Sequence, residues 1–130
     1  MHRILIVTPD RTSLSAFATS LEESQDVQVA WAESGQSAVS DVMKHTPLGV
    51  IIDENLPDMS GLDLVRRLLP INAMINTVMI SKLPPEAFHE ASEGLGIMAQ
   101  LPPKPTPSDA LAILDRLERF SAAAISHRRT

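Results

Sequence analysis

Three side chains in this sequence could together handle a phosphoryl group: a carboxylate, a hydroxyl and an amine. Asp53 follows the apolar run 48–52, Ser81 ends a second apolar segment, and Lys104 comes shortly after a third. A carboxylate can attack phosphorus to form an acyl phosphate, a hydroxyl can donate to a phosphoryl oxygen, and an ammonium group can neutralise the developing negative charge. This chemistry requires a fold that brings the three residues to one place.

The elements expected to position these residues are strands. Leu48 and the run 50–52 are apolar without alternation, which is typical of a strand covered on both faces in a parallel sheet. Asp53 is therefore expected at the carboxyl end of a strand, where open α/β sheets bind their ligands. Turn-forming residues delay the next helix until about Gly61.

Segments with strand character alternate with segments of helical spacing along the chain. The fourth predicted helix begins at Pro84 or Pro85 and is ended by Gly94 or Gly96, and the last has Thr106 as its N-cap. This alternation predicts a parallel sheet with helices on both faces, a three-layer α/β/α sandwich. The flavodoxin-like strand order 2-1-3-4-5 fits the pattern, as do other doubly wound orders. Five strands are predicted, over residues 3–7, 27–31, 48–52, 77–81 and 97–101.

The composition suits one domain with a single core, since the chain has 130 residues and 44% of them are apolar. We expect this domain over residues 1–124, with a tail or the start of a linker at 125–130. The net charge of −5 and a pI near 5.2 disfavour direct binding of nucleic acid and favour protein partners. The sequence has no cysteine, no signal peptide and no apolar run long enough to cross a membrane, which is typical of a cytoplasmic protein.

The segment 48–61 resembles the phosphoacceptor strand and loop of response-regulator receiver domains. The family pattern is an apolar run, Asp, any residue, Asn, a hydrophobic residue, Pro and then Gly, and this chain reads LGVIIDENLPDMSG. The resemblance extends over nearly the whole chain and selects the strand order 2-1-3-4-5. It implies that Asp53 accepts a phosphoryl group from a sensor histidine kinase or a phosphotransfer protein.

The same resemblance implies roles for other residues. Ser81 matches the hydroxyl that binds the phosphoryl group, Lys104 the lysine that pairs with it, and the backbone carbonyl of Asn55 a ligand of Mg²⁺ beside Asp53. The Lys104–Pro105 peptide bond is expected to be cis, as in the family. A receiver is not an enzyme beyond its own phosphorylation and dephosphorylation. Its fourth helix, fifth strand and fifth helix form the expected partner face, which could also support a homodimer.

The segment after the first strand departs from the family. Receivers carry two acids there that help to hold Mg²⁺, whereas this chain has Thr8 and Pro9. Asp10 is the next acid and a doubtful metal ligand, because it could turn inward only if the loop were rebuilt. Alternatively, Thr8 caps the first helix, Pro9 is its first residue and Asp10 complements the helix dipole. We therefore expect weak or absent Mg²⁺ binding and a direct ion pair between Asp53 and Lys104.

Other positions near the site have structural interpretations. Glu54 adjoins Asp53, but neighbouring strand residues point to opposite faces, so it is not expected to be a ligand. Asp58 is expected to be a turn former. On the fifth strand, Gln100 or Leu101 stands where the family carries a switching aromatic residue.

Two functions fit these observations. The first is a phosphoacceptor receiver that switches a protein-interaction face, and Asp53, Ser81 and Lys104 favour it. The second is a pseudo-receiver, a protein-binding or dimerisation module that works without phosphorylation, and Thr8 with Pro9 favours that one. A flavodoxin-like nucleotide or flavin binder is disfavoured, because the loop after the first strand contains no glycine.

Overall fold

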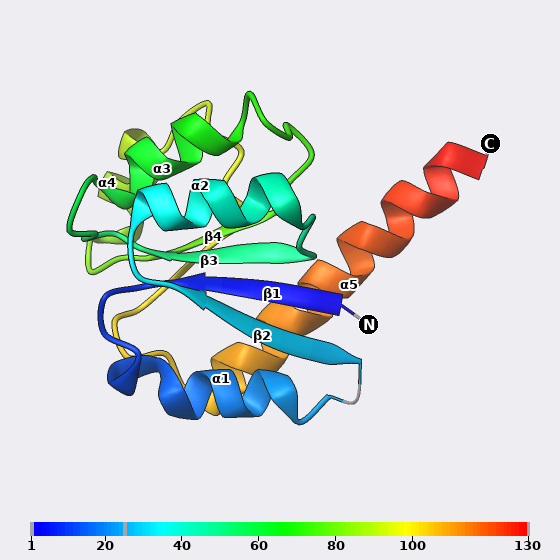
Figure 1. Ribbon diagram of the computed structural model, residues 1–130, viewed down its shortest axis with the longest axis horizontal. Coiled ribbons are helices and arrows are strands. Elements are labelled where there is room, and N and C mark those ends of the chain that lie inside the picture. The colour runs from blue at the N-terminus through cyan, green and yellow to red at the C-terminus, as the bar shows by residue number, and fades with distance from the viewer. Residues whose placement is uncertain (1, 25, 130) are drawn as a thin grey trace.

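The computed structural model describes the backbone of residues 2–24 and 26–129, and the side chains as far as residue 119. Strands and helices alternate along this part of the chain, as predicted (Figure 1). Two strands are shorter than expected: Ser81 lies just outside the fourth, and the fifth begins only at Ala99. The elements are β1 (His2–Val7), α1 (Ser15–Glu22), β2 (Val27–Ala32), α2 (Gly35–Lys44), β3 (Gly49–Asp53), α3 (Gly61–Leu68), β4 (Thr77–Ile80), α4 (Pro85–Ala91), β5 (Ala99–Leu101) and α5 (Pro107–Arg129).

The strands form one parallel sheet of order β2-β1-β3-β4-β5, which confirms the flavodoxin-like topology. β1 and β3 lie inside the sheet, and their apolar runs are buried because helices cover both faces. The register places Asp53 beside Ile80, and Ile80 beside Leu101. The carboxyl ends of β3, β4 and β5 therefore meet at one edge of the sheet.

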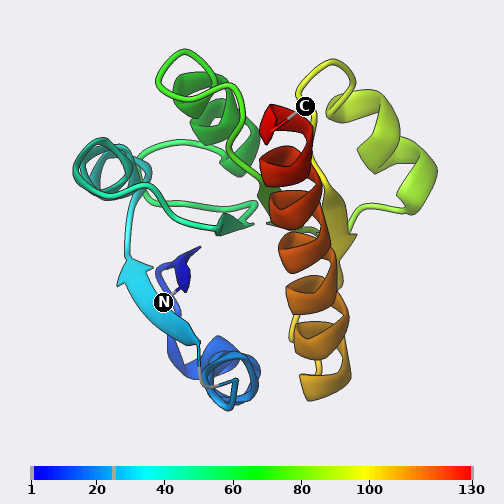
Figure 2. The same cartoon turned by 90° about the vertical axis from the view of Figure 1, so that its right-hand side faces the viewer.

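Two apolar layers hold the sandwich together, with α1 and α5 on one face and α2, α3 and α4 on the other (Figures 1 and 2). Phe17 of α1 and Leu117 of α5 are fully buried in the first layer, as is Leu64 of α3 in the second. Successive strand residues alternate between the layers, so Ile51 contacts the first and Ile52 the second. A rigid sheet results, on which the residues at its edge are positioned.

Side chains cap the helices that follow the site loops. Ser34 and Ser60 are the N-caps of α2 and α3, and each hydroxyl accepts a hydrogen bond from the backbone N–H three residues on, at 3.1 Å. At the start of α5, Thr106 and Asp109 exchange hydrogen bonds between side chain and backbone, which confirms the predicted cap. Each such cap contributes about 1 kcal/mol to stability.

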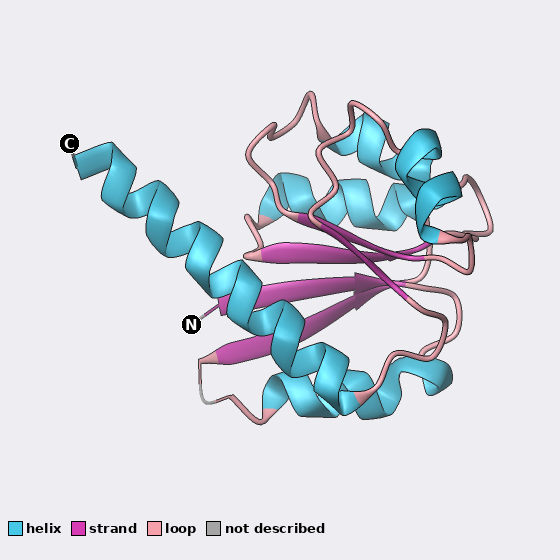
Figure 3. Cartoon of the chain, turned by 180° about the vertical axis from the view of Figure 1, so that it is seen from behind, coloured by secondary structure: helices cyan, strands magenta, loops and turns pink. Residues whose placement is uncertain are grey.

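The last helix continues past the body of the domain, and Figure 3 shows its C-terminal part extending away from the sheet. The predicted tail at 125–130 falls within α5 as far as Arg129, and Thr130 lies outside the described residues. None of the described helices combines the length and the apolar character needed to cross a bilayer.

Candidate functional site

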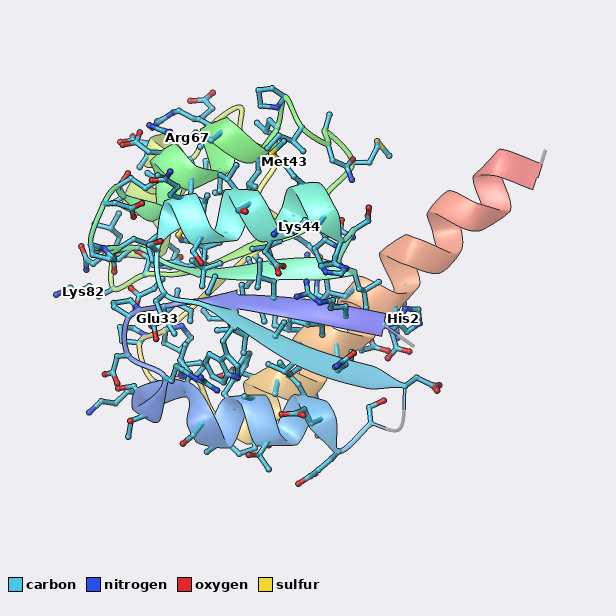
Figure 4. All side chains as sticks on the ribbon, viewed as in Figure 1. His2, Glu33, Met43, Lys44, Arg67 and Lys82 are labelled. Carbon is cyan, nitrogen blue, oxygen red and sulfur yellow. The ribbon has the colours of Figure 1, made fainter. Side chains whose placement is uncertain are left out.

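A small pocket lies at the edge of the sheet where the strands end. Its volume of about 230 Å³ is below the roughly 300–1,000 Å³ typical of ligand pockets, which suits a small ion better than a large organic ligand. Lys82 and Glu33 lie at this edge and His2 at the opposite one (Figure 4). The polar side chains that line the pocket are Thr8, Asp10, Ser13, Asp53, Glu54, Asn55, Lys82 and Lys104.

Asp53 is the last residue of β3 and is half-buried. Its Oδ2 accepts a hydrogen bond from the Thr8 hydroxyl and its Oδ1 one from the backbone N–H of Asn55, both at 3.1 Å. Behind it, the loop returns so closely that a Cβ at Gly61 would lie 2.7 Å from the carbonyl oxygen of Asp53. Only glycine leaves room for this approach, so the sequence of the loop fixes how Asp53 is presented.

Thr8 directly follows β1 and is only 1% exposed. Its hydroxyl accepts from the backbone N–H of Asp10 at 3.1 Å while donating to Asp53. The prediction of a helix start at this segment is wrong, because α1 begins only at Ser15, after a 3₁₀ turn. The carboxylate of Asp10 accepts hydrogen bonds from the Ser13 hydroxyl and backbone N–H, and these bonds, the hydroxyl foremost, hold the pKa of Asp10 below its usual range.

Glu54 binds the loop that follows β4, a contact that the sequence did not predict. Its Oε2 accepts from the backbone N–H of Lys82 at 2.7 Å, and its Oε1 accepts from the Ser81 hydroxyl at 3.4 Å. Ser81 is buried, and its hydroxyl oxygen also accepts from the backbone N–H of Leu83 at 3.1 Å. The alternation rule failed because it applies inside a strand, and β3 ends at Asp53. What could have indicated a role for Glu54 is its position in the sequence, directly after β3 and therefore at the edge of the sheet where ligands bind.

Lys104 lines the pocket but forms no ion pair with Asp53, so the predicted pair is wrong. Its backbone φ of 56° lies in the left-handed region, which is uncommon for a residue with a side chain. The peptide bond to Pro105 is trans, so the expectation of a cis bond is also wrong. Two prolines, Pro102 and Pro103, directly precede Lys104 and restrict the backbone there. Sequence reasoning missed Lys82, a second cation at the pocket.

Metal binding was predicted at Asp53 and the carbonyl of Asn55, with Asp10 as a doubtful third ligand. Among the residues that the structure describes, no three His, Cys, Asp or Glu side chains come together in a group that could hold a metal ion. Asp10 is engaged with Ser13, and Thr8 contributes a hydroxyl that already has two hydrogen-bond partners. Asp10, Asp53 and Asn55 line one pocket, but the carboxylate of Asp10 is bound to Ser13.

On β5, the backbone carbonyl of Leu101 accepts from the N–H of Ser81 at 3.0 Å, while Gln100 contacts the loop after β4 through its side chain. Its Nε2 donates to the backbone carbonyls of Ser81 at 3.3 Å and Leu83 at 2.8 Å. Leu101 is buried in the apolar layer beneath α5. The loop is thus bound on one side by Glu54 and on the other by Gln100.

Asp58 does more than form a turn. Its carboxylate accepts hydrogen bonds from the backbone N–H groups of Gly35 at 2.8 Å and Gln36 at 2.9 Å, the first residues of α2. These N–H groups, that of Gln36 foremost, lower the pKa of Asp58. The loop after β3 is therefore joined to the N-terminus of a neighbouring helix.

Comparisons with known proteins agree with this fold. No curated protein matches the chain. Solved structures with the same fold include a CheY-like response regulator receiver domain protein from Methanospirillum hungatei, with a TM-score of 0.82, 22% identity, and 95% of this chain and 98% of that chain covered. The chemotaxis response regulator CheY4 of Vibrio cholerae has a TM-score of 0.80 at 19% identity, covering 90% and 98%. The BeF3-activated DrrB receiver domain has a TM-score of 0.78 at 20% identity, covering 92% and 98%.

Sequence identities of 19–22% to these solved structures show the fold alone. The match to a family model extends over the site residues as well as the core. Residues 4–114 match the response regulator receiver domain. This span contains β2 to β5, residues 4–7 of β1 and every residue that lines the pocket. The chain belongs to the response regulator receiver domain family.

Proposed function

We propose that this domain accepts a phosphoryl group on Asp53 from a sensor histidine kinase or a phosphotransfer protein, in the cytoplasm. Receiver domains of this family interact with such proteins in two-component signalling and are generally not enzymes. The observation that carries the proposal is the position of Asp53. It is half-buried at the end of a central strand, in a small pocket that also holds Lys82 and Lys104.

The chemistry asked of Asp53 is a single displacement at phosphorus. One carboxylate oxygen forms a bond to phosphorus while the bond from phosphorus to the imidazole nitrogen of the donor breaks, and that nitrogen keeps the electron pair. The hydrogen bonds from Thr8 and Asn55 fix the carboxylate, which lowers the entropic cost of alignment. Lys82 and Lys104 supply positive charge near the transferred group.

The metal contribution is expected to be weak. Receiver domains typically bind Mg²⁺ at an acidic pocket, where the ion neutralises phosphoryl oxygens. Here Asp53 and the carbonyl of Asn55 would hold it, with water and phosphoryl oxygens completing the coordination. Asp10 would have to leave Ser13 before it could join them.

Intact mass measurement after incubation with Mg²⁺ and a small phosphodonor such as acetyl phosphate tests the proposal. We expect one added phosphoryl group on the wild type and none on Asp53→Asn. Asp26→Asn is the matched control, because Asp26 is an exposed aspartate outside the pocket, and this variant should be labelled like the wild type. Failure to label the wild type, under conditions that label an ordinary receiver, would refute the phosphoacceptor role.

A pseudo-receiver that acts without phosphorylation is the second candidate function. The observation that favours it is the buried hydroxyl of Thr8, which occupies the acid position and is bonded to Asp53. Partner binding or self-association that is the same in the wild type and in Asp53→Asn, with or without phosphodonor, would support this candidate.

The expected partner face consists of α4, β5 and α5. β5 is an edge strand of three residues, and the side chains of Leu83, in the loop before α4, and Leu111, on α5, are 39% and 59% exposed. An open strand edge with exposed apolar side chains suits a protein partner or a second copy of the domain. Sedimentation analysis of Leu111→Glu against the wild type would test whether the domain dimerises through this face.

A further inference from the structure

We propose that Glu54 is an internal ligand that occupies the hydrogen-bond donors for the phosphoryl group, and that phosphorylation of Asp53 requires its displacement. This inference rests on the proposed phosphoacceptor function and adds a residue that sets how readily the site accepts an anion. Glu54 is half-buried and lines the same pocket as Asp53. Both of its carboxylate oxygens form hydrogen bonds within the protein.

The contacts of Glu54 are those of an anion in a binding site. Its two carboxylate oxygens accept from two donors on successive residues, the Ser81 hydroxyl at 3.4 Å and the Lys82 backbone N–H at 2.7 Å. The shorter distance is typical of a hydrogen bond to a charged acceptor. The oxygen of Ser81 is held by the N–H of Leu83, which leaves the hydroxyl hydrogen directed to Glu54.

A phosphoryl group on Asp53 would need the same donors. Asp53 and Glu54 are consecutive, and the backbone N–H of Glu54 bonds to the carbonyl of Ile80, the residue before Ser81. This pairing places the carboxyl end of β3 next to that of β4, which Ser81 and Lys82 directly follow. Each hydrogen serves one acceptor well, so the phosphoryl oxygens and the Glu54 carboxylate compete for it. Both groups are anions, and their mutual repulsion opposes joint occupancy.

The remaining hydrogen bonds of the loop explain how Glu54 could leave without unfolding it. Gln100 binds the carbonyls of Ser81 and Leu83 from the other side, so the loop keeps contacts with β5 when the carboxylate moves away. The two donors would then remain in place for an incoming anion.

Substitutions at position 54 separate competition for the donors from simple charge repulsion. Glu54→Asp keeps the charge but is one methylene shorter, so it cannot reach both donors. Glu54→Gln keeps the length and an acceptor oxygen but removes the charge, and Glu54→Ala removes both. The probe is fluoroberyllate, an anion that mimics a phosphoryl group, and its binding in excess Mg²⁺ is followed by ¹⁹F NMR.

We expect Glu54→Ala to bind fluoroberyllate about tenfold more tightly than the wild type, the effect of freeing a charge-assisted hydrogen bond. Glu54→Asp should also bind more tightly than the wild type. The inference is overturned if Glu54→Asp matches the wild type while Glu54→Gln and Glu54→Ala both gain, because charge alone would then explain the effect. Equal binding by all four proteins overturns it too, and leaves the phosphoacceptor function standing.

Amide hydrogen exchange at Lys82 gives a readout that needs no phosphoryl group. The exchange rate should rise several-fold in Glu54→Asp and Glu54→Ala, because the amide loses its acceptor. Glu86→Ala is the control, since Glu86 is an exposed glutamate in the first turn of α4 and outside the pocket. An unchanged rate in Glu54→Ala overturns the inference alone, whereas no fluoroberyllate binding by any of the proteins overturns the phosphoacceptor function together with it.

Discussion

Two segments at the carboxyl edge of the sheet differ in how their polar groups are used: the β1 side, residues 8–10, of which Thr8 and Asp10 line the pocket, and the β4 side, residues 81–83, of which Lys82 lines it. On the β1 side, the Thr8 hydroxyl donates to Asp53. On the β4 side, the Ser81 hydroxyl and the Lys82 N–H donate to Glu54. The donor of the β1 side is therefore used by Asp53 itself, whereas the donors of the β4 side are occupied by its neighbour.

This difference affects how readily each side could offer hydrogen-bond donors to an incoming anion. The donors bound to Glu54 become free when that one side chain moves, which costs two hydrogen bonds. If Asp53 is phosphorylated as we propose, the β4 side could therefore respond within the existing sequence. Four substitutions test this comparison.

Gly61→Ala should disturb both sides at once. Its Cβ would lie 2.7 Å from the carbonyl oxygen of Asp53 and 3.1 Å from the Cα of Glu54, so the loop backbone must shift. We expect a loss of about 2–3 kcal/mol in the free energy of unfolding, measured in urea. Gly94→Ala is the control: Gly94 has open space around it but a φ of 83°, so the loss should be only about 1 kcal/mol. An equal loss in both variants would contradict the close-packing argument.

Thr8→Val should affect the β1 side alone. The valine is of similar size but cannot donate to Asp53 or accept from Asp10, so we expect a loss of about 1–2 kcal/mol in the free energy of unfolding. A double-mutant cycle with Asp53→Ala isolates the bond between the two side chains, and the effects should be non-additive. Additive effects would mean that the Thr8 hydroxyl stabilises the protein only through its hydrogen bond with the N–H of Asp10.

Gln100→Leu should loosen the β4 side alone. The two hydrogen bonds to the carbonyls of Ser81 and Leu83 would be lost, at a cost of about 1 kcal/mol in unfolding free energy. Amide exchange at Lys82 and Leu83 should become faster, while exchange at Asp10 stays unchanged. Gln28→Leu, an exposed position on β2, serves as the control. If exchange at Asp10 rose equally, the two sides of the pocket would not be independent.

Asp41→Asn should leave both sides unchanged and lower stability slightly. Asp41 accepts two hydrogen bonds from the Arg3 guanidinium, at 2.5 and 2.8 Å, and these lower the pKa of Asp41. A carboxyl with a lowered folded-state pKa stabilises the fold above its unfolded pKa, near 4, and this contribution is lost as the pH falls through the folded value.

We therefore expect the wild type to exceed Asp41→Asn by about 0.5–1 kcal/mol at pH 7, with the difference shrinking below about pH 4. Urea unfolding at several pH values measures it. A difference that stays constant from pH 7 to pH 3 would show that the ion pair is not its source.

The fold could be predicted because burial imposes regular patterns on the sequence. The apolar run before Asp53 and the cap at Thr106 depend on local rules, and both are found where they were expected. The residues that meet at the carboxyl edge followed from the strand order alone. The sequence therefore predicted which elements would carry the site.

The bonds inside the site were not predictable in the same way. Glu54 and Lys82 lie in turns, where side-chain direction follows no period, and their contacts depend on loop geometry. The expected pair of Asp53 with Lys104 failed because charge attraction was considered without the hydrogen bonds that compete for the same carboxylate. At a protein surface these weak alternatives differ by about 1 kcal/mol or less, and the sequence does not rank them.

The bond between Asp58 and the N-terminus of α2 limits how a phosphodonor can approach. Since the loop after β3 is anchored to that helix, an outward movement of the loop would have to break these hydrogen bonds. On the proposed function, a phosphodonor's histidine would approach Asp53 more easily over the segment after β4, on the side from which Lys82 projects (Figure 4). The route to the acceptor carboxylate would thus cross the same short stretch of chain that Glu54 restrains.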